Sequence, residues 1–257
     1  MDAGTGGLDD GRMDEPVLLI WIALSFLAAG VVKGVSGMGL PTLAMALLSL
    51  RMPAAEAAAL MLLPALLTNI AQCRGPHGAL LLRRLWPLWT GTALGALFSP
   101  VPDLAAGGGA ARWALGAVLV GYGLWGLRRP ELPAPGRHAP WLGALAGLAS
   151  GALTAATGVF VLPMVPYLQA LRLDRDALIQ ALGLSFTVAS LALAARLGQL
   201  DGNPMAALDA RAGALALLTA FAGMALGARL RGRLPPLTFQ RALYGVFLLL
   251  GLLMLRR

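Results

Sequence analysis

Apolar residues in this chain gather into ten runs, separated by short polar stretches or by stretches rich in glycine and proline. No run alternates apolar and polar residues, as the strands of a membrane barrel would. Because backbone polar groups in lipid must be bonded within their own segment, the runs predict helices. The expected helical segments are residues 17–33, 40–50, 54–73, 85–101, 113–127, 141–153, 159–171, 177–197, 206–228 and 239–255.

The composition indicates a membrane protein. Of the 257 residues, 58% are hydrophobic and only 12% are charged, and the mean hydropathy is +0.75. An ordinary soluble domain has about 25% charged residues, so a soluble globule of this composition could not cover its surface. Five of the six tryptophans lie near segment ends, where an aromatic belt is expected: Trp86, Trp89, Trp113, Trp125 and Trp141. We therefore expect an all-α integral membrane protein that crosses the lipid bilayer many times.

The net charge of +8 does not indicate a nucleic-acid partner, because the basic residues fall singly or in pairs at segment ends and form no basic face. Cys73 is the only cysteine, and the two histidines lie in connections. No CxxC or HxxxH pair is present, so we expect no metal, no cofactor and no catalytic residues. A GxxxxGK[ST] loop is also absent, so any active transport by this chain alone must be secondary.

Two of the ten segments are too short for an ordinary membrane span. Residues 40–50 and 159–171 number eleven and thirteen, whereas a hydrocarbon core of about 30 Å needs roughly 20 helical residues. Each short segment follows a stretch of small residues, 34–39 in the first case and 154–158 in the second. These stretches predict a broken helix at two places in the chain.

The two breaks belong to an internal duplication. Four short motifs recur in the same order in the second half: 30–34 with 147–151, 48–51 with 169–172, 91–95 with 223–227, and 112–116 with 241–245. We therefore divide the chain into a disordered acidic N-terminal tail (1–16), a first transmembrane repeat (17–129), a linker (130–140) and a second transmembrane repeat (141–257).

Charge distribution separates two topologies. If the short segments cross the membrane, each half has five crossings, and 13 of the 20 lysines and arginines lie on one side. If they dip in and return, the split is 11 to 9. The positive-inside rule favours the first arrangement, in which the two repeats are inverted, each with a broken helix near its start, and the tail lies outside the cell.

Lys33 is the strongest candidate for the chemistry, because it is the only lysine and ends the first segment immediately before a break. An ammonium beside the start of a half-helix can hold an anion. The alternative is a lysine that extends from a helix end to the membrane surface. The expected substrate-binding residues at the two breaks are Lys33, Gly34, Ser36, Gly37, Gly39, Thr154, Thr157 and Gly158.

Four polar residues lie inside the third and eighth segments: Asn69, Gln72, Gln180 and Ser185. Polar groups are costly when they face lipid, so these either bond helix to helix or line a cavity. No carboxylate lies in the middle of a segment, which disfavours coupling through a buried Asp or Glu relay.

The sequence Gly-Val-Val-Lys-Gly-Val-Ser-Gly-Met-Gly at 30–39, paired with a second small-residue break after a central linker, resembles the sulfite exporter TauE/SafE family, also called the toluene sulfonate uptake permeases. The resemblance runs from about Leu24 to Leu255. It implies a cell-membrane transporter of sulfite, sulfonates or other small anions. Lys33, Gly34, Ser36, Gly37 and Gly39 match the first motif, and Gly151 and Gly158 the second. Where the family usually has three glycines, this chain has Thr-Ala-Ala-Thr-Gly158, a departure that concerns the substrate more than the fold.

These observations favour a multi-pass secondary transporter of small anions in the cell (inner) membrane, working by alternating access at the two breaks. The substrates expected are sulfite, organosulfonates or related sulfur-containing or carboxylate anions. The alternatives are an intramembrane enzyme, for which we find no catalytic set, and a non-transporting membrane assembly protein, which has no need of two breaks. A homo-oligomer is compatible with the sequence.

Overall fold

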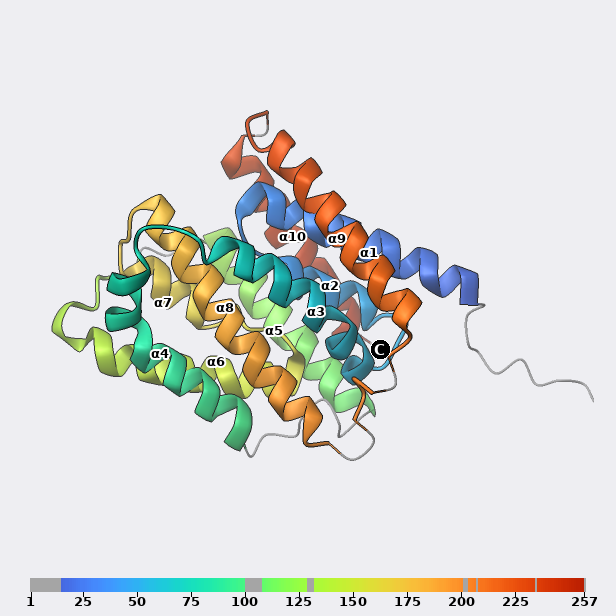
Figure 1. The fold of residues 1–257 in the computed structure, drawn as a ribbon, viewed down its shortest axis with the longest axis horizontal. Helices are drawn as coiled ribbons and strands as arrows, with labels where there is room; N and C mark the ends of the chain where they lie inside the picture. Colours follow the sequence, from blue (N-terminus) through green and yellow to red (C-terminus); the bar gives the residue numbers. More distant parts are fainter. Residues whose placement is uncertain are drawn as a thin grey trace, which may run out of the picture.

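The computed structural model describes residues 15–99, 108–128, 132–200, 203–206, 208–233 and 235–256, and within these ranges it contains helices and no strand. The expected all-α class is therefore confirmed. The α-helices are α1 (Glu15–Ser36), α2 (Leu40–Leu48), α3 (Ala54–Gln72), α4 (Gly78–Phe98), α5 (Gly108–Arg128), α6 (Ala139–Thr157), α7 (Met164–Ala170), α8 (Arg175–Gly198), α9 (Ala210–Leu230) and α10 (Pro236–Leu255) (Figure 1). A short 3₁₀ helix, Gly136–His138, precedes α6.

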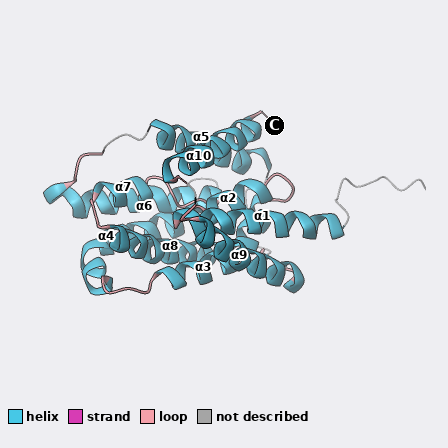
Figure 2. Cartoon of the chain, turned by 90° about the horizontal axis from the view of Figure 1, so that it is seen from above, coloured by secondary structure: helices cyan, strands magenta, loops and turns pink. Residues whose placement is uncertain are grey.

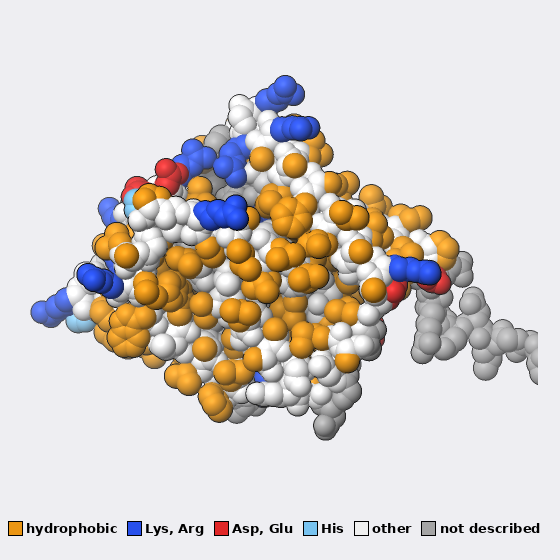
Figure 3. Space-filling view, viewed as in Figure 1, with side chains coloured by type: hydrophobic (Ala, Val, Ile, Leu, Met, Phe, Trp, Pro, Cys, Tyr) orange, Lys and Arg blue, Asp and Glu red, His pale blue; other side chains and the backbone are white. Residues whose placement is uncertain are grey.

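Seven of these helices are long and apolar enough to span a membrane: α1, α3, α5, α6, α8, α9 and α10. The exposed surface agrees, because large apolar side chains such as Phe98 and Leu218 are 75% and 70% exposed. Figure 3 shows hydrophobic side chains spread over the broad face of the molecule, while arginines gather at its edges. The chain is thus a multi-pass membrane protein.

The short helices α2 and α7 lie inside the bundle. Every residue of α2 except Leu47 is buried, and six of the seven residues of α7 are buried. A helix that is apolar on all sides is typical of such an interior position. In Figure 2, α5 and α10 lie together on one side of the two short helices, and α3 and α8 lie on the other.

Each short helix runs back along the long helix before it. In the first half, the Trp21 Nε1 group near the start of α1 donates a hydrogen bond of 3.1 Å to the carbonyl of Leu47, near the end of α2. The guanidinium of Arg51 lies 5.5 Å from the centre of the Trp21 ring. In the second half, the Tyr167 hydroxyl of α7 donates at 2.9 Å to the carbonyl of Ala139, at the start of α6. The chain therefore reverses direction between the two members of each pair.

Glycines bring α1 against α9 and α4 against α6. A Cβ on Gly34 would lie 2.3 Å from the Met224 carbonyl oxygen, and one on Gly227 would lie 2.2 Å from that of Val31. The same close approach joins Gly95 to Leu148 and Gly151 to Thr92, each at 2.1 Å. Because these distances leave no room for a side chain, the helix backbones touch, as is common between membrane helices.

Three helices begin five or more residues from the expected position. Helix α5 starts at Gly108 instead of residue 113. Helix α4 starts at Gly78 instead of residue 85, so Arg83 and Arg84 lie within it, with their side chains exposed. Helix α7 starts at Met164 instead of residue 159, because Gly158 has a left-handed backbone and Pro163 directly precedes the helix. The expected tail falls largely on residues 1–14, outside the described residues, and Glu15 begins α1. The expected linker includes the 3₁₀ helix and the start of α6.

Candidate functional site

The first reversal, between α1 and α2, is built from glycine. Gly37 and Gly39 have φ angles of 81° and 97°, a left-handed conformation that costs other residues about 1–2 kcal/mol. The Gly37 amide still donates to the Lys33 carbonyl at 2.8 Å, and Gly39 accepts from the Leu43 amide at 2.9 Å. Pro41 stands in the first turn of α2, where a missing N–H costs least.

Lys33 lies within the bundle, one turn before the reversal, with 1% of its surface exposed. Its ammonium donates to Thr68 Oγ1 at 3.1 Å and to Asn69 Oδ1, both on α3. Among the described residues it forms no ion pair, so only neutral oxygens balance the charge. The Asn69 amide nitrogen is also buried, and has no partner within the described part of the chain. A buried charge without a counter-charge is costly, so Lys33 is the least favourably placed of the buried polar side chains at this reversal.

Two further side chains hold the reversal from opposite sides. The Gln72 amide of α3 donates to the Gly37 carbonyl at 2.7 Å. The guanidinium of Arg231, at the end of α9, donates to the Gly34 carbonyl from Nε at 3.1 Å and from Nη2 at 2.7 Å. Carbonyls at a helix C-terminus lack intrahelical partners and carry partial negative charge, so a cation is favourable there.

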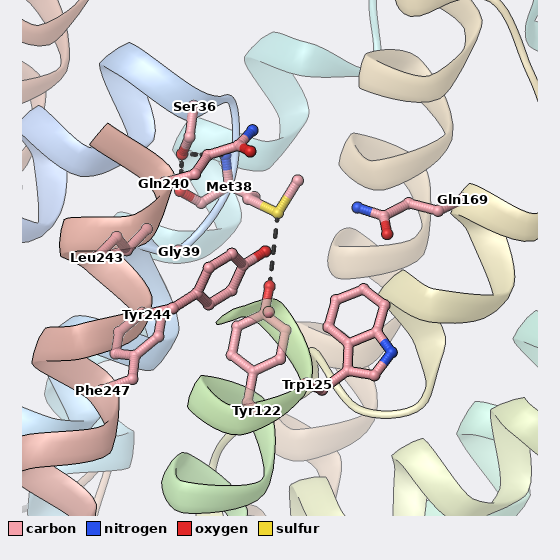
Figure 4. A pocket seen from close by; sticks show the side chains of 11 residues that line it. Ser36, Met38, Gly39, Tyr122, Trp125, Gln169, Gln240, Leu243, Tyr244 and Phe247 are labelled. Atoms are coloured by element: carbon pink, nitrogen blue, oxygen red, sulfur yellow. Dashed lines mark hydrogen bonds between the residues drawn. The ribbon is translucent and has the colours of Figure 1, made fainter. Parts of the chain in front are cut away.

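A cavity of about 200 Å³ adjoins the reversal. It is lined by Ser36, Met38 and Gly39 from the reversal, by Gln169 from α7, and by residues of α5 and α10: Tyr122, Trp125, Gly126, Gln240, Leu243, Tyr244 and Phe247 (Figure 4). We call it the aromatic cavity. None of the described residues that line it is charged.

Tyr122 organises the aromatic wall. Its ring stacks on Trp125 at 6.0 Å between centroids and meets Tyr244 edge-on at 5.3 Å. Its hydroxyl donates to the Met38 sulfur at 3.7 Å, which joins α5 to the reversal (Figure 4). The cavity thus combines an apolar aromatic wall with a few polar groups, Ser36, Gln169 and Gln240, a composition typical of small-molecule sites.

Of the residues expected at the first break, Ser36 and Gly39 line this cavity. The Ser36 hydroxyl bonds to the carbonyls of Val32 and Met38, each at 2.8 Å. Lys33 is directed toward α3 instead and is not part of the cavity wall, nor are Gly34 and Gly37.

The residues expected at the second break lie elsewhere. The hydroxyls of Thr154 and Thr157 donate to carbonyls one turn back, at 2.7 and 2.6 Å, and Thr157 Oγ1 also accepts from the Val159 amide at 3.2 Å. Gly158 has a φ of 69°, and a Cβ there would lie 2.9 Å from the Met45 methyl of α2. None of the three lines the aromatic cavity, although Gly158 is in contact with the first half.

The four further candidates make hydrogen bonds between elements. Asn69 and Gln72 hold Lys33 and Gly37. Gln180 of α8 donates to the carbonyls of Cys73 and Gly75, and accepts from the His77 amide. The Ser185 hydroxyl accepts from Trp89 Nε1 at 2.9 Å. None of the four is part of the aromatic cavity wall.

Sequence reasoning did not find most of the cavity wall. Tyr122 and Tyr244 are two of only three tyrosines in the chain, and a buried tyrosine needs a partner for its hydroxyl, which was a usable signal. Trp125, expected in an aromatic belt, lines the cavity instead. Arg231 gave no signal in the sequence, because arginine at a segment end is ordinary in a membrane protein.

Over the residues that the structure describes, no group of three His, Cys, Asp or Glu side chains could hold a metal ion.

Comparison with known proteins gives one match. Neither the curated proteins nor the solved structures include a match to this chain. A model of the family described as Sulfite exporter TauE/SafE matches residues 22–254, which includes all ten helices except the first seven residues of α1 and the last residue of α10. The chain therefore belongs to the sulfite exporter TauE/SafE family of membrane transporters.

Proposed function

We propose that this protein is a secondary transporter in the cell (inner) membrane that carries small anions by alternating access at its two breaks. The substrates are sulfite, organosulfonates or related sulfur-containing or carboxylate anions. The observation that carries the proposal is the ammonium of Lys33, which is buried next to the first reversal and faces only neutral oxygens. Ionisable groups inside a membrane protein usually mark the pathway of a substrate or ion.

In this proposal the two halves are inverted repeats. Support comes from the glycine contacts between helices, in which residues 30–34 pack on 223–227 and residues 91–95 pack on 147–151. Since 30–34 recurs as 147–151 and 91–95 recurs as 223–227, a two-fold rotation that exchanges the halves turns the first contact into the second. The short helices support it as well, since each returns along the helix before it.

Lys33 provides the positive charge for the substrate. The aromatic cavity reaches Ser36, one turn beyond Lys33, and the reversal is held by single side chains of α3 and α9. Releasing the ammonium from Thr68 and Asn69 would let it turn toward the cavity and meet an anion there. Gly34, Gly37 and Gly39 allow the backbone to move, and Thr154, Thr157 and Gly158 form the matching break of the second half.

Lys33→Ala tests this assignment. A hydrogen bond to a charged group contributes about 1.5–3 kcal/mol, so the half-saturation concentration for uptake into proteoliposomes should rise roughly tenfold to a hundredfold. Lys33→Arg should recover part of the loss, because it keeps the charge with a different shape. Arg51→Ala, which removes an exposed charge far from the reversal, is the control. An unchanged half-saturation concentration in folded Lys33→Ala would show a structural lysine and contradict the proposal.

The substrate is identified by thermal unfolding of the purified protein with sulfite, sulfate, sulfonates or carboxylates. A ligand at 100 times its dissociation constant should stabilise the folded state by about 2.7 kcal/mol. Protection that is present in the wild type and absent in Lys33→Ala assigns the ligand to this site.

A further inference from the structure

A second, larger cavity of about 570 Å³ lies beside the first reversal. Four elements form it: the end of α1, the start of α8, the end of α9 and the start of α10. Its lining residues are Val35, Ser36, Arg175, Ala228, Arg231, Gly232, Phe239 and Gln240, and we call it the arginine vestibule. Arginines gather on this part of the surface in Figure 3, near the end of α9 and the start of α10, two helices that Figure 1 labels.

We propose that the arginine vestibule is a second anion-binding site, separate from Lys33, in which Arg175 and Arg231 receive the sulfonate or carboxylate group of a substrate on the side of the membrane where it opens. This inference rests on the proposed function where it places the vestibule on the route of a transported substrate. Anion binding by the two arginines does not itself require transport.

The charge of the vestibule supports the inference. Among the residues that the structure describes, Arg175 and Arg231 are the only charged ones that line it, and none of the lining residues carries a carboxylate. The nearest acids in the sequence flank Arg175, and Asp174 is engaged as the cap of α8, where its carboxylate accepts from the Ala177 amide at 2.8 Å. Asp176 is exposed. Guanidinium groups match the geometry of sulfonate and carboxylate oxygens and bind them through paired N–H donors.

Arg231 is held in place before any anion arrives. Its Nε and Nη2 both donate to the Gly34 carbonyl, and Gly34 itself touches the backbone of α9. A fixed donor loses less entropy on binding than a free one. A guanidinium has five N–H donors, and because only two of them are engaged with the Gly34 carbonyl, the others can bind an anion while the contact to the reversal is kept.

The vestibule adjoins the aromatic cavity. Ser36 and Gln240 line both spaces, so they form the boundary between them. A substrate thus meets two guanidinium groups first, then the aromatic wall, and then the region of Lys33. Charged vestibules of this kind raise the local concentration of an oppositely charged solute and speed its capture at low salt.

The direct test is protection of individual arginines from phenylglyoxal. The wild-type protein in phosphatidylcholine nanodiscs is modified with or without benzenesulfonate or sulfate, at matched ionic strength in sodium chloride, and each arginine is quantified by mass spectrometry after chymotryptic digestion. Sulfite is avoided because it adds to dicarbonyl reagents. At ten times the dissociation constant, we expect modification of Arg175 and Arg231 to slow by about tenfold, while Arg172 and Arg229 react at unchanged rates. Equal protection of all four arginines, or of none, overturns the inference.

A lipid phosphate could present similar oxygens to the same arginines. Nanodiscs that contain phosphatidylglycerol distinguish a lipid phosphate from a soluble anion as the ligand of these arginines. Protection by this lipid without any protection by benzenesulfonate or sulfate would make the vestibule a lipid site and overturn the inference.

Matched variants then connect binding to transport. Arg175→Gln with Arg231→Gln removes two positive charges from the vestibule, and Arg172→Gln with Arg229→Gln removes two from nearby exposed positions. The first pair should raise the half-saturation concentration about tenfold for substrate added on the vestibule side only, and should abolish the salt dependence of uptake. The control pair should change neither. If both pairs behave alike, the vestibule plays no part in capture. If the arginines are protected while Lys33→Ala transports normally, the vestibule stands and the proposed role of Lys33 falls.

Discussion

The two reversals of the chain share a backbone plan and differ in their chemistry. At the first, two left-handed glycines precede α2, and Gln72 and Arg231 donate to backbone carbonyls of the reversal. Lys33, one turn earlier, donates to the side chains of Thr68 and Asn69 on α3. At the second, only Gly158 is left-handed, and it is followed by the buried apolar residues Val159, Phe160 and Val161. The ring of Phe160 packs 5.5 Å from that of Phe186. Both halves thus reverse through a left-handed glycine, while the two cations, Lys33 from the first half and Arg231 from the second, both lie at the first reversal.

The position that matches Lys33 makes the difference concrete. By the recurrence of 30–34 in 147–151, Lys33 corresponds to Ser150. Ser150 is fully buried on α6, and within the described part of the chain its hydroxyl has no hydrogen-bond partner. The comparison teaches that α1 and α6 keep the same close glycine packing while they differ at one buried position, a lysine in α1 and a serine in α6.

The largest expected effect concerns the orientation of the two halves. Arg51 and Arg172 occupy matching places after α2 and α7, and inverted repeats put them on opposite sides of the membrane. In a Cys73→Ala background, Arg51→Cys should react completely with an impermeant thiol reagent added outside, and Arg172→Cys should react only from the cytoplasmic side. Labelling of both from the same side would refute the inverted arrangement.

A smaller effect compares the two left-handed glycines. Gly37→Ala should cost about 1–2 kcal/mol for its backbone conformation alone, because its Cβ would meet no atom closer than 3.8 Å. Gly158→Ala carries the same cost and also overlaps the buried Met45 side chain, which adds about 1–3 kcal/mol. The measurement is thermal unfolding in detergent.

The overlap is checked with Met45→Ala. If it is real, the cost of Gly158→Ala should be smaller in that background than in the wild type, since residues in contact are coupled. Equal costs in both backgrounds, or equal costs for the two glycines, would show that Met45 does not distinguish the two reversals.

The smallest effect is expected at Ser150. Burial of an unpaired hydroxyl costs about 1–3 kcal/mol, so Ser150→Ala should keep or slightly raise the unfolding temperature, and uptake should be unchanged. A loss of uptake comparable to that of Lys33→Ala would show that both matching positions act in transport, and that the two halves are more alike than their chemistry indicates.

The sequence predicted much of the fold because the signals are local. Ten apolar runs and the recurrence of short motifs led to ten helices, and most ends were correct within a few residues. The starts of α4 and α7 were wrong for physical reasons. Arg83 and Arg84 interrupt the apolar pattern but are tolerated at exposed positions of a helix end, and the residues after Gly158 are apolar without being helical.

By itself, the sequence determined that the chain is a helical membrane protein, that its motifs recur, and that Lys33 is unusual. Only the tertiary structure decided which residues meet: Lys33 with Asn69 across 36 positions, Arg231 with Gly34 across 197, and the tyrosines of α5 and α10 around one cavity. The reason is that lipid and protein interior are equally apolar. A membrane helix therefore carries little pattern that separates its packed face from its lipid face, and the partners of each side chain emerge only when the helices are packed.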